Sequence, residues 1–166
     1  KLHEKAVVFI EYAPLETAWV PILGDNYLYL YCLWVSGSHK GKGYGRMLME
    51  YCLQDARERG KSGVCMLGAD KQKAWLSDQA FAQKFGFETV DATEYGYQLL
   101  ACSLDGTVPR FSPAAKRGEI DGQELTVYYD FQCPYICQSV ELIRQYCGER
   151  QIPVSLRLVD TQQKAK

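Results

Sequence analysis

Apolar and polar positions along the first part of the chain follow the pattern of β-strands. Apolar runs at residues 6–12, 17–22 and 27–35 predict three strands, separated by segments that contain proline, glycine, asparagine or aspartate. The third strand is the longest, and it is rich in tyrosine and leucine. This part of the chain is therefore expected to contribute neighbouring strands to one sheet.

The period of the pattern then changes. Apolar residues recur at helical spacing over 46–59, and Gly60 is placed to end that helix. A short strand of buried type is expected at 63–67, a short helix at 78–85, and a pair of strands joined by a turn within 87–104. The order β-β-β-α-β-α-β-β predicts an α/β fold built on a mixed sheet of the α+β kind.

A cationic glycine loop joins the third strand to the long helix. Its sequence is Lys40-Gly41-Lys42-Gly43-Tyr44-Gly45. Glycine permits positive φ and lets a ligand approach the backbone, while the unpaired N–H groups at a helix N-terminus attract anionic oxygens. Lys40, Lys42 and Arg46 add positive charge, so the loop predicts a site for a phosphate-bearing ligand.

Two common phosphate sites do not fit this loop. A P-loop requires Ser or Thr after Gly-Lys, but here Gly45 is followed by Arg46 and Met47. A dinucleotide fingerprint requires G-x-G-x-x-G in a parallel βαβ unit, whereas the spacing here is G-x-G-x-G. The remaining candidate is the phosphate-binding loop of acyl-coenzyme A transferases.

The residues from Leu33 to Leu48 resemble the first signature of the GNAT superfamily of N-acetyltransferases, and residues 80–87 resemble its second. The first loop position is Lys40 where the family usually has Gln or Arg, which keeps a cation but loses a bidentate fork. The resemblance implies acetyl-CoA as co-substrate and no metal. It assigns cofactor binding to Leu33, Trp34, Val35, Lys40, Gly41, Lys42, Gly43, Tyr44, Gly45 and Arg46.

The resemblance begins at the family's second strand, so the fold is expected to lack the usual N-terminal segment. That segment normally supplies part of the wall around the acceptor substrate. Either this numbering starts inside a longer protein, or the entrance is built differently.

The amino-acid composition of the chain changes after Leu104. Residues 1–104 are expected to form the acetyltransferase domain, and 105–122 a linker rich in loop formers, with Phe111 able to dock on a surface. Residues 123–166 predict a strand, a helix and a strand, with Cys133 and Pro134 at the first turn. This part resembles the first half of a thioredoxin-like domain, and GNAT proteins with such an extension form the YoaP-type group.

Direct acetyl transfer to an amine requires a base, and carboxylates near the early strands are the candidates. Glu11 is the preferred candidate, with Glu16 and Asp25 as alternatives. Each of the three also fits the interpretation of an ordinary surface carboxylate without a catalytic role.

The acid that protonates the departing thiolate is harder to assign. Many relatives place a tyrosine at the position of Ala82, which has no hydroxyl. Tyr95 and Tyr97 from the strand pair, and Ser77 from the preceding loop, are the candidates, although most tyrosines in such a chain serve packing.

Cys133 is the residue that suggests an alternative function in thiol redox chemistry. At a helix N-cap its thiolate would be favoured by the helix dipole. Cys137 lies four residues further on, whereas redox pairs of thioredoxin-like domains are spaced three apart. A retained fold without redox chemistry is the competing interpretation.

Composition limits the remaining functions. The chain has 166 residues, 47% of them apolar, and a net charge of −1, which argues against a nucleic-acid partner. No apolar run approaches a membrane span, and seven cysteines without a regular framework indicate reduced thiols in a cytoplasmic protein. A small-molecule or peptide amine is the expected acceptor, and a homodimer is allowed. The alternative function is a thiol-redox or interaction protein whose GNAT domain binds CoA with little catalysis.

Overall fold

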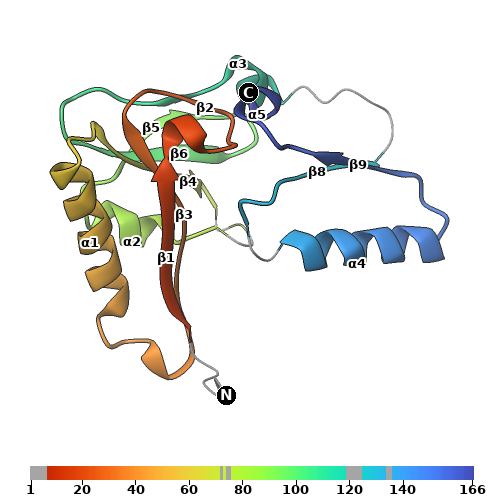
Figure 1. The fold of residues 1–166 in the computed structure, drawn as a ribbon, viewed down its shortest axis with the longest axis horizontal. Coiled ribbons are helices and arrows are strands. Elements are labelled where there is room, and N and C mark those ends of the chain that lie inside the picture. The colour runs from red at the N-terminus through yellow and green to blue at the C-terminus, as the bar shows by residue number, and fades with distance from the viewer. Residues whose placement is uncertain (1–6, 72, 74–75, 119–124, 134–135) are drawn as a thin grey trace.

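A five-stranded mixed sheet forms the centre of the protein in a computed structural model that describes residues 7–71, 73, 76–118, 125–133 and 136–166 (Figure 1). The strand order is β1-β3-β4-β6-β5, in which β3 and β4 are parallel and the other pairs antiparallel. The strands are β1 (Val8–Pro14), β3 (Tyr27–Val35), β4 (Gly63–Ala69), β5 (Glu88–Ala92) and β6 (Tyr97–Ser103). The predicted mixed α/β architecture is confirmed.

Two helices, α1 (Tyr44–Glu58) and α2 (Gln79–Gln83), cover one face of this sheet. The apolar residues of α1 recur every three or four positions, which places them on one side of the helix. Met49, Cys52 and Ala56 thereby pack against Leu28 and Leu30 of β3 in one core cluster. Each of these five side chains is at most 3% exposed.

The opposite face of the sheet has a second core, closed by short elements. These elements are the 3-10 helix η1 (Leu15–Thr17), β2 (Ile22–Leu23), β7 (Arg110–Phe111) and α3 (Pro113–Arg117). A second 3-10 helix, η2 (Gly37–His39), precedes the glycine loop. The second core buries Tyr27, Tyr29 and Leu99 together with Phe111.

Two segments differ from the sequence expectation. The strand expected at 17–22 is wrong for most of its length, because Leu15–Thr17 form a 3-10 turn and only Ile22–Leu23 pair with another strand. Pro21 lies within that stretch and Pro14 shortly before it, and both lack the N–H that a longer ladder would need. Within the segment expected as a linker, Phe111 is only 3% exposed and belongs to the second core.

The main sheet opens between its two parallel strands. Hydrogen-bonded pairing of β3 with β4 covers only Tyr27–Tyr29 and Gly63–Cys65. β3 continues to Val35 and β4 to Ala69 without pairing with each other. A bulge accompanies the separation: Glu11 pairs with Cys32 and Tyr12 with Leu30, so Tyr31 is an extra residue of β3.

The C-terminal part forms a β-α-β unit with its own two-stranded sheet. β8 (Leu125–Tyr129) and β9 (Val154–Leu158) pair in parallel through α4 (Ile136–Glu149), and α5 (Gln162–Ala165) follows. These elements match the expected strand, helix and strand, while Pro134, expected as the first helical residue, lies outside the described residues. Whether the unit is thioredoxin-like stays a prediction.

None of the helices in the described part of the chain has the length and apolar character needed to cross a membrane.

The buried position of Phe111 predicts a large stability difference between two phenylalanines. Phe111→Ala should lower the free energy of unfolding by about 3–5 kcal/mol, because it removes a buried ring and leaves a cavity. Phe131→Ala is the matched control, since that ring is 58% exposed and its loss should change stability by about 0.5 kcal/mol. Urea unfolding of both variants measures the difference. Equal losses would show that residues 110–117 do not seal the second core.

Candidate functional site

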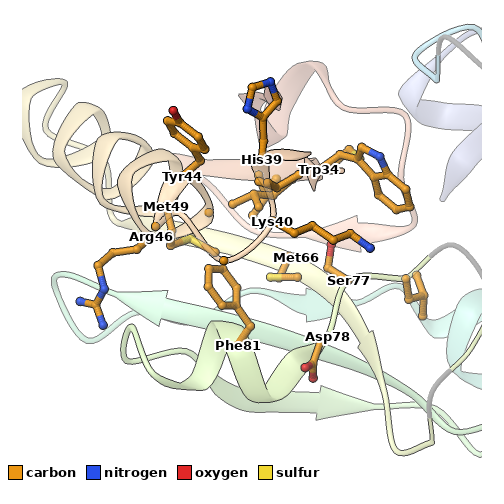
Figure 2. A pocket seen from close by; sticks show the side chains of 18 residues that line it. Trp34, His39, Lys40, Tyr44, Arg46, Met49, Met66, Ser77, Asp78 and Phe81 are labelled. Atoms are coloured by element: carbon orange, nitrogen blue, oxygen red, sulfur yellow. The ribbon is translucent and has the colours of Figure 1, made fainter. Parts of the chain in front are cut away.

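A cavity of about 480 Å³ lies where β3 and β4 separate. This volume is in the usual range of small-ligand sites. The residues of β3 from Leu30 to Val35 form one wall, apart from Tyr31, and the glycine loop lies at one end. Met49 of α1, Met66 of β4 and Phe81 of α2 form an apolar floor, and Figure 2 shows these three side chains pointing towards the same space.

The glycine loop leads directly into α1. Gly41 and Gly43 have φ of 75° and 83°, values that disfavour residues with a side chain. Gly43 is the N-cap of α1, and no acidic residue stands in the first turn of that helix. The free N–H groups of the first turn and the positive end of the helix dipole therefore lie beside the cavity, as the sequence predicted.

The three predicted cations differ in their positions. Lys40 lines the cavity, and Figure 2 shows its side chain extending towards the loop that carries Ser77. Arg46 also contributes to the lining, but its guanidinium lies 3.3 Å from Glu50 and 5.5 Å from the centre of the Phe85 ring. Lys42 is exposed at the loop surface and is absent from the cavity wall.

The wall formed by β3 offers backbone groups rather than charged side chains. Among the residues that the structure describes, the edge of β3 that faces β4 has no strand partner beyond Tyr29. Such an edge can pair with an extended ligand that carries amide groups, in the manner of an added strand. Leu33, Trp34 and Val35, all predicted to contact the cofactor, belong to this stretch and line the cavity.

Glu11 lies beside the cavity on the other face of the sheet. Ile10 and Tyr12 pack into the core under α1, so the alternation of side chains directs Glu11 to the opposite face. Its partner across the ladder is Cys32, which lines the cavity. Burial and the nearby carboxylate of Asp130 raise the pKa of Glu11, as expected of a group that can accept a proton.

The alternative bases lie elsewhere. Glu16 accepts a hydrogen bond from the backbone N–H of Asn26, which precedes β3 at the end where β3 and β4 are still paired. Asp25 adjoins Asn26. Neither residue lines the cavity, and Glu16 has a structural role in holding the start of β3.

The candidate acids are separated by the fold. Ser77 lines the cavity, whereas Tyr95 and Tyr97 do not. Tyr95 borders another cavity, next to the C-terminal unit, and its hydroxyl donates to the carbonyl of Arg117 at 3.3 Å. Tyr97 lies under the ammonium of Lys73, 4.8 Å from its ring centre. Ala82 is fully buried in the core.

Cys133 is exposed and lies just before α4. Cys137 is exposed as well, and all seven cysteines are free thiols. The redox role of Cys133 stays a prediction. Within the part of the chain that the structure describes, no cluster of three or more His, Cys, Asp or Glu side chains could hold a metal ion.

Several site residues escaped the sequence analysis. Met49, Met66 and Phe81 occupy positions typical of core residues, and only the separation of β3 from β4 exposes them to a ligand. Helical spacing could have identified Met49 and Phe81 as residues facing the sheet, but not as cavity lining. Cys32 also lines the cavity, and its place next to the bulge has no local sequence signal.

The chain is similar in sequence to known acetyltransferases. The sequence profile of the acetyltransferase (GNAT) family matches residues 2–87. The uncharacterized N-acetyltransferase YoaP of Bacillus subtilis strain 168 is 37% identical over 147 residues, which cover 87% of this chain. The chain spans only 59% of the length of that relative.

Two solved structures are among those that partly match this chain. A Desulfovibrio desulfuricans protein assigned to the GNAT family shares 18% identity, with a TM-score of 0.44 over 54% of this chain and 55% of that one. The PaiA N-acetyltransferase of Thermoplasma acidophilum, solved in complex with coenzyme A, shares 15% identity, with a TM-score of 0.40 over 49% of this chain and 48% of that one. With its profile match over more than half of its length, the chain belongs to the GNAT family of acetyltransferases.

Proposed function

We propose that this protein is an N-acetyltransferase that moves an acetyl group from acetyl-CoA to an amine by direct transfer. The observation that carries the proposal is the meeting of two features at one cavity. An unpaired edge of β3 runs towards a cationic glycine loop at the N-terminus of α1. Family membership supports the same activity.

Each feature suits a different part of acetyl-CoA. The N–H groups of the loop and of the first turn of α1, with Lys40, suit the pyrophosphate. The free edge of β3 suits the amides of the pantetheine arm, which would pair as an added strand does. The apolar side chains of Met49, Met66 and Phe81 suit the uncharged part of the arm and keep water from the thioester.

Transfer needs an uncharged amine at the thioester carbonyl. Glu11 is the proposed base, supported by its position across the ladder from Cys32 and by its raised pKa. Its carboxylate takes one proton from the ammonium, the amine nitrogen bonds to the carbonyl carbon, and the carbon–sulfur bond breaks. The nitrogen gives up its second proton as the amide forms, and the departing thiolate takes up one proton. The Ser77 hydroxyl, which lines the cavity, is the candidate relay that receives the first of these protons and donates the second.

The proposed setting follows the sequence expectation. The acceptor is a small-molecule or peptide amine, and the seven free thiols support a cytoplasmic protein. A homodimer stays a prediction.

Acetyl transfer predicts CoA release that depends on an added amine. The protein is incubated with acetyl-CoA and a panel of primary amines, including diamines, amino acid esters and peptides with a free N-terminus. Acetylated product and CoA, separated by chromatography and identified by mass, should form in equal amounts. CoA release at the same rate with and without every amine would show a thioesterase rather than a transferase.

Two glycines with the same backbone strain give a test of the cofactor site. Gly43→Asp should weaken acetyl-CoA binding by at least about a hundredfold, because it places a carboxylate where anionic oxygens are expected. Gly106→Asp is the matched control, since Gly106 has φ of 86° and open space around it, like Gly43, and lies outside the cavity wall. Calorimetric titration with acetyl-CoA measures both. Equal affinities for the two variants would contradict the assignment of the loop.

The proposed base predicts both a rate loss and a pH profile. Glu11→Gln should lower kcat by about 100- to 10,000-fold with unchanged acetyl-CoA affinity, whereas Glu88→Gln, at an exposed position of β5, should act like the parent. Because burial and the Asp130 charge raise the pKa of Glu11, the active carboxylate is lost as pH falls through a value above the ordinary glutamate pKa. The acid limb of kcat/KM should therefore lie above that value. Cys32 and Tyr31, which also face Glu11, titrate at higher pH because burial raises the pKa of each.

A retained acid limb in Glu11→Gln would exclude this carboxylate as the base.

A further inference from the structure

The C-terminal unit contacts the main sheet through a short loop, residues 130–133, between β8 and α4. The side-chain amide of Gln132 makes three hydrogen bonds across the boundary. Its oxygen accepts from the Trp19 backbone N–H and from the Tyr31 hydroxyl, each at 2.6 Å. Its nitrogen donates to the Thr17 carbonyl at 3.0 Å. One amide is thus bonded at both ends to the acetyltransferase part of the chain.

The conformation of the loop is itself fixed. The backbone N–H of Gln132 donates to the carboxylate of Asp130 at 2.7 Å, which closes a tight turn. The partners of the Gln132 amide are 101 to 115 residues away in sequence. A loop held in this way presents a defined surface to the sheet.

This surface lies next to the cavity, on the face of the main sheet opposite α1 and α2. Tyr31, one of the partners of Gln132, is the extra residue of β3 at the bulge, and the next residue, Cys32, lines the cavity. Tyr31 belongs to the core on the face opposite α1 and α2. Figure 1 shows the same arrangement, with α1 and α2 on one side of β1 and β3 and the C-terminal unit on the other.

The charged groups support this placement. In addition to burial, the negative charge of Asp130 raises the pKa of Glu11 and that of Tyr31. The nearby Cys133 likewise adds to the rise in the pKa of Cys32. The loop, the proposed base and the bulge are therefore neighbours. If acetyl-CoA occupies the cavity on the helical side, this face is the remaining approach to the carbonyl carbon.

We propose that residues 130–133 form the wall of the acceptor site, and that Gln132 is the positioning residue that holds this wall against the bulge of β3. The inference rests on the proposed acetyl transfer. An attacking amine must approach the carbonyl from the face of the sheet that the helices leave free, and the loop bounds that approach. Acceptor use then depends on the C-terminal unit, whereas acetyl-CoA binding does not.

The first experiment measures how accessible Cys32 is to a reagent in solution, and it does not depend on catalysis. Gln132→Met keeps the length of the side chain and removes its hydrogen bonds, while Gln145→Met makes the same change at an amide that bonds within α4 to Glu149. Each variant and the parent, saturated with acetyl-CoA, is treated with N-ethylmaleimide, and labelling of Cys32 is followed by peptide mass analysis. With the helical side covered by acetyl-CoA, Cys32 in Gln132→Met should react at least about tenfold faster than in the parent. Gln145→Met should match the parent.

Equal protection of Cys32 in Gln132→Met and the parent would overturn the proposal. Gln132→Glu retains the oxygen that accepts from Trp19 and Tyr31, so its labelling rate should lie between the two. Circular dichroism of each variant checks that the fold is kept.

The second experiment assigns the covered face to the acceptor. For the amine that the parent acetylates best, kcat/KM should fall about tenfold in Gln132→Met, mainly through KM, with acetyl-CoA affinity within about twofold. Faster labelling of Cys32 with unchanged kcat/KM would show a docked loop that is no acceptor wall, and would overturn the proposal. Failure of the parent to acetylate any amine would instead count against the proposed function, while the labelling rates would still decide whether the loop covers this face.

Discussion

The end of hydrogen bonding between β3 and β4 after Tyr29 and Cys65 is the constraint on which the candidate site depends. The extra residue of β3 at Tyr31 lies just beyond this point, and a cavity with a free strand edge as one wall occupies the gap. The register of β1 on this side of the extra residue places Glu11 opposite Cys32. The glycine loop, which joins the end of β3 to the N-terminus of α1, lines the same cavity.

Local sequence signals predicted those parts of the fold that local chemistry determines. The long strand at Tyr27–Val35 was predicted at its observed bounds, since a run of tyrosine, leucine and other apolar residues ends at Ser36 and Gly37. The glycine loop and α1 were found because glycine spacing and helical periodicity are visible in the chain itself. The strand expected at 17–22 was wrong for most of its length, since Ala18 and Val20 enter the second core without pairing in a ladder and only Ile22 belongs to a strand.

Features that depend on distant residues could not be predicted. The bulge at Tyr31 is defined by the register of another strand, and neither strand carries a signal for it. Gln132 is an ordinary polar residue in sequence, and its role comes from three partners more than 100 residues away. Phe111 was named as a residue able to dock, but only its partners in the fold show which surface it covers. The cavity floor formed by Met49, Met66 and Phe81 is likewise a property of the opened sheet.

An unpaired strand edge is usually a hazard, because a strand from another molecule can pair with it and begin aggregation. Proteins commonly protect such edges with charges, prolines or short strands at the border of a sheet. Here the free edge of β3 lies inside the sheet, between α1 and α2 on one face and residues 130–133 near the other. A strand from another molecule would have to enter the cavity of about 480 Å³ to reach that edge, so the position of the edge protects it where a border strand relies on charges and prolines.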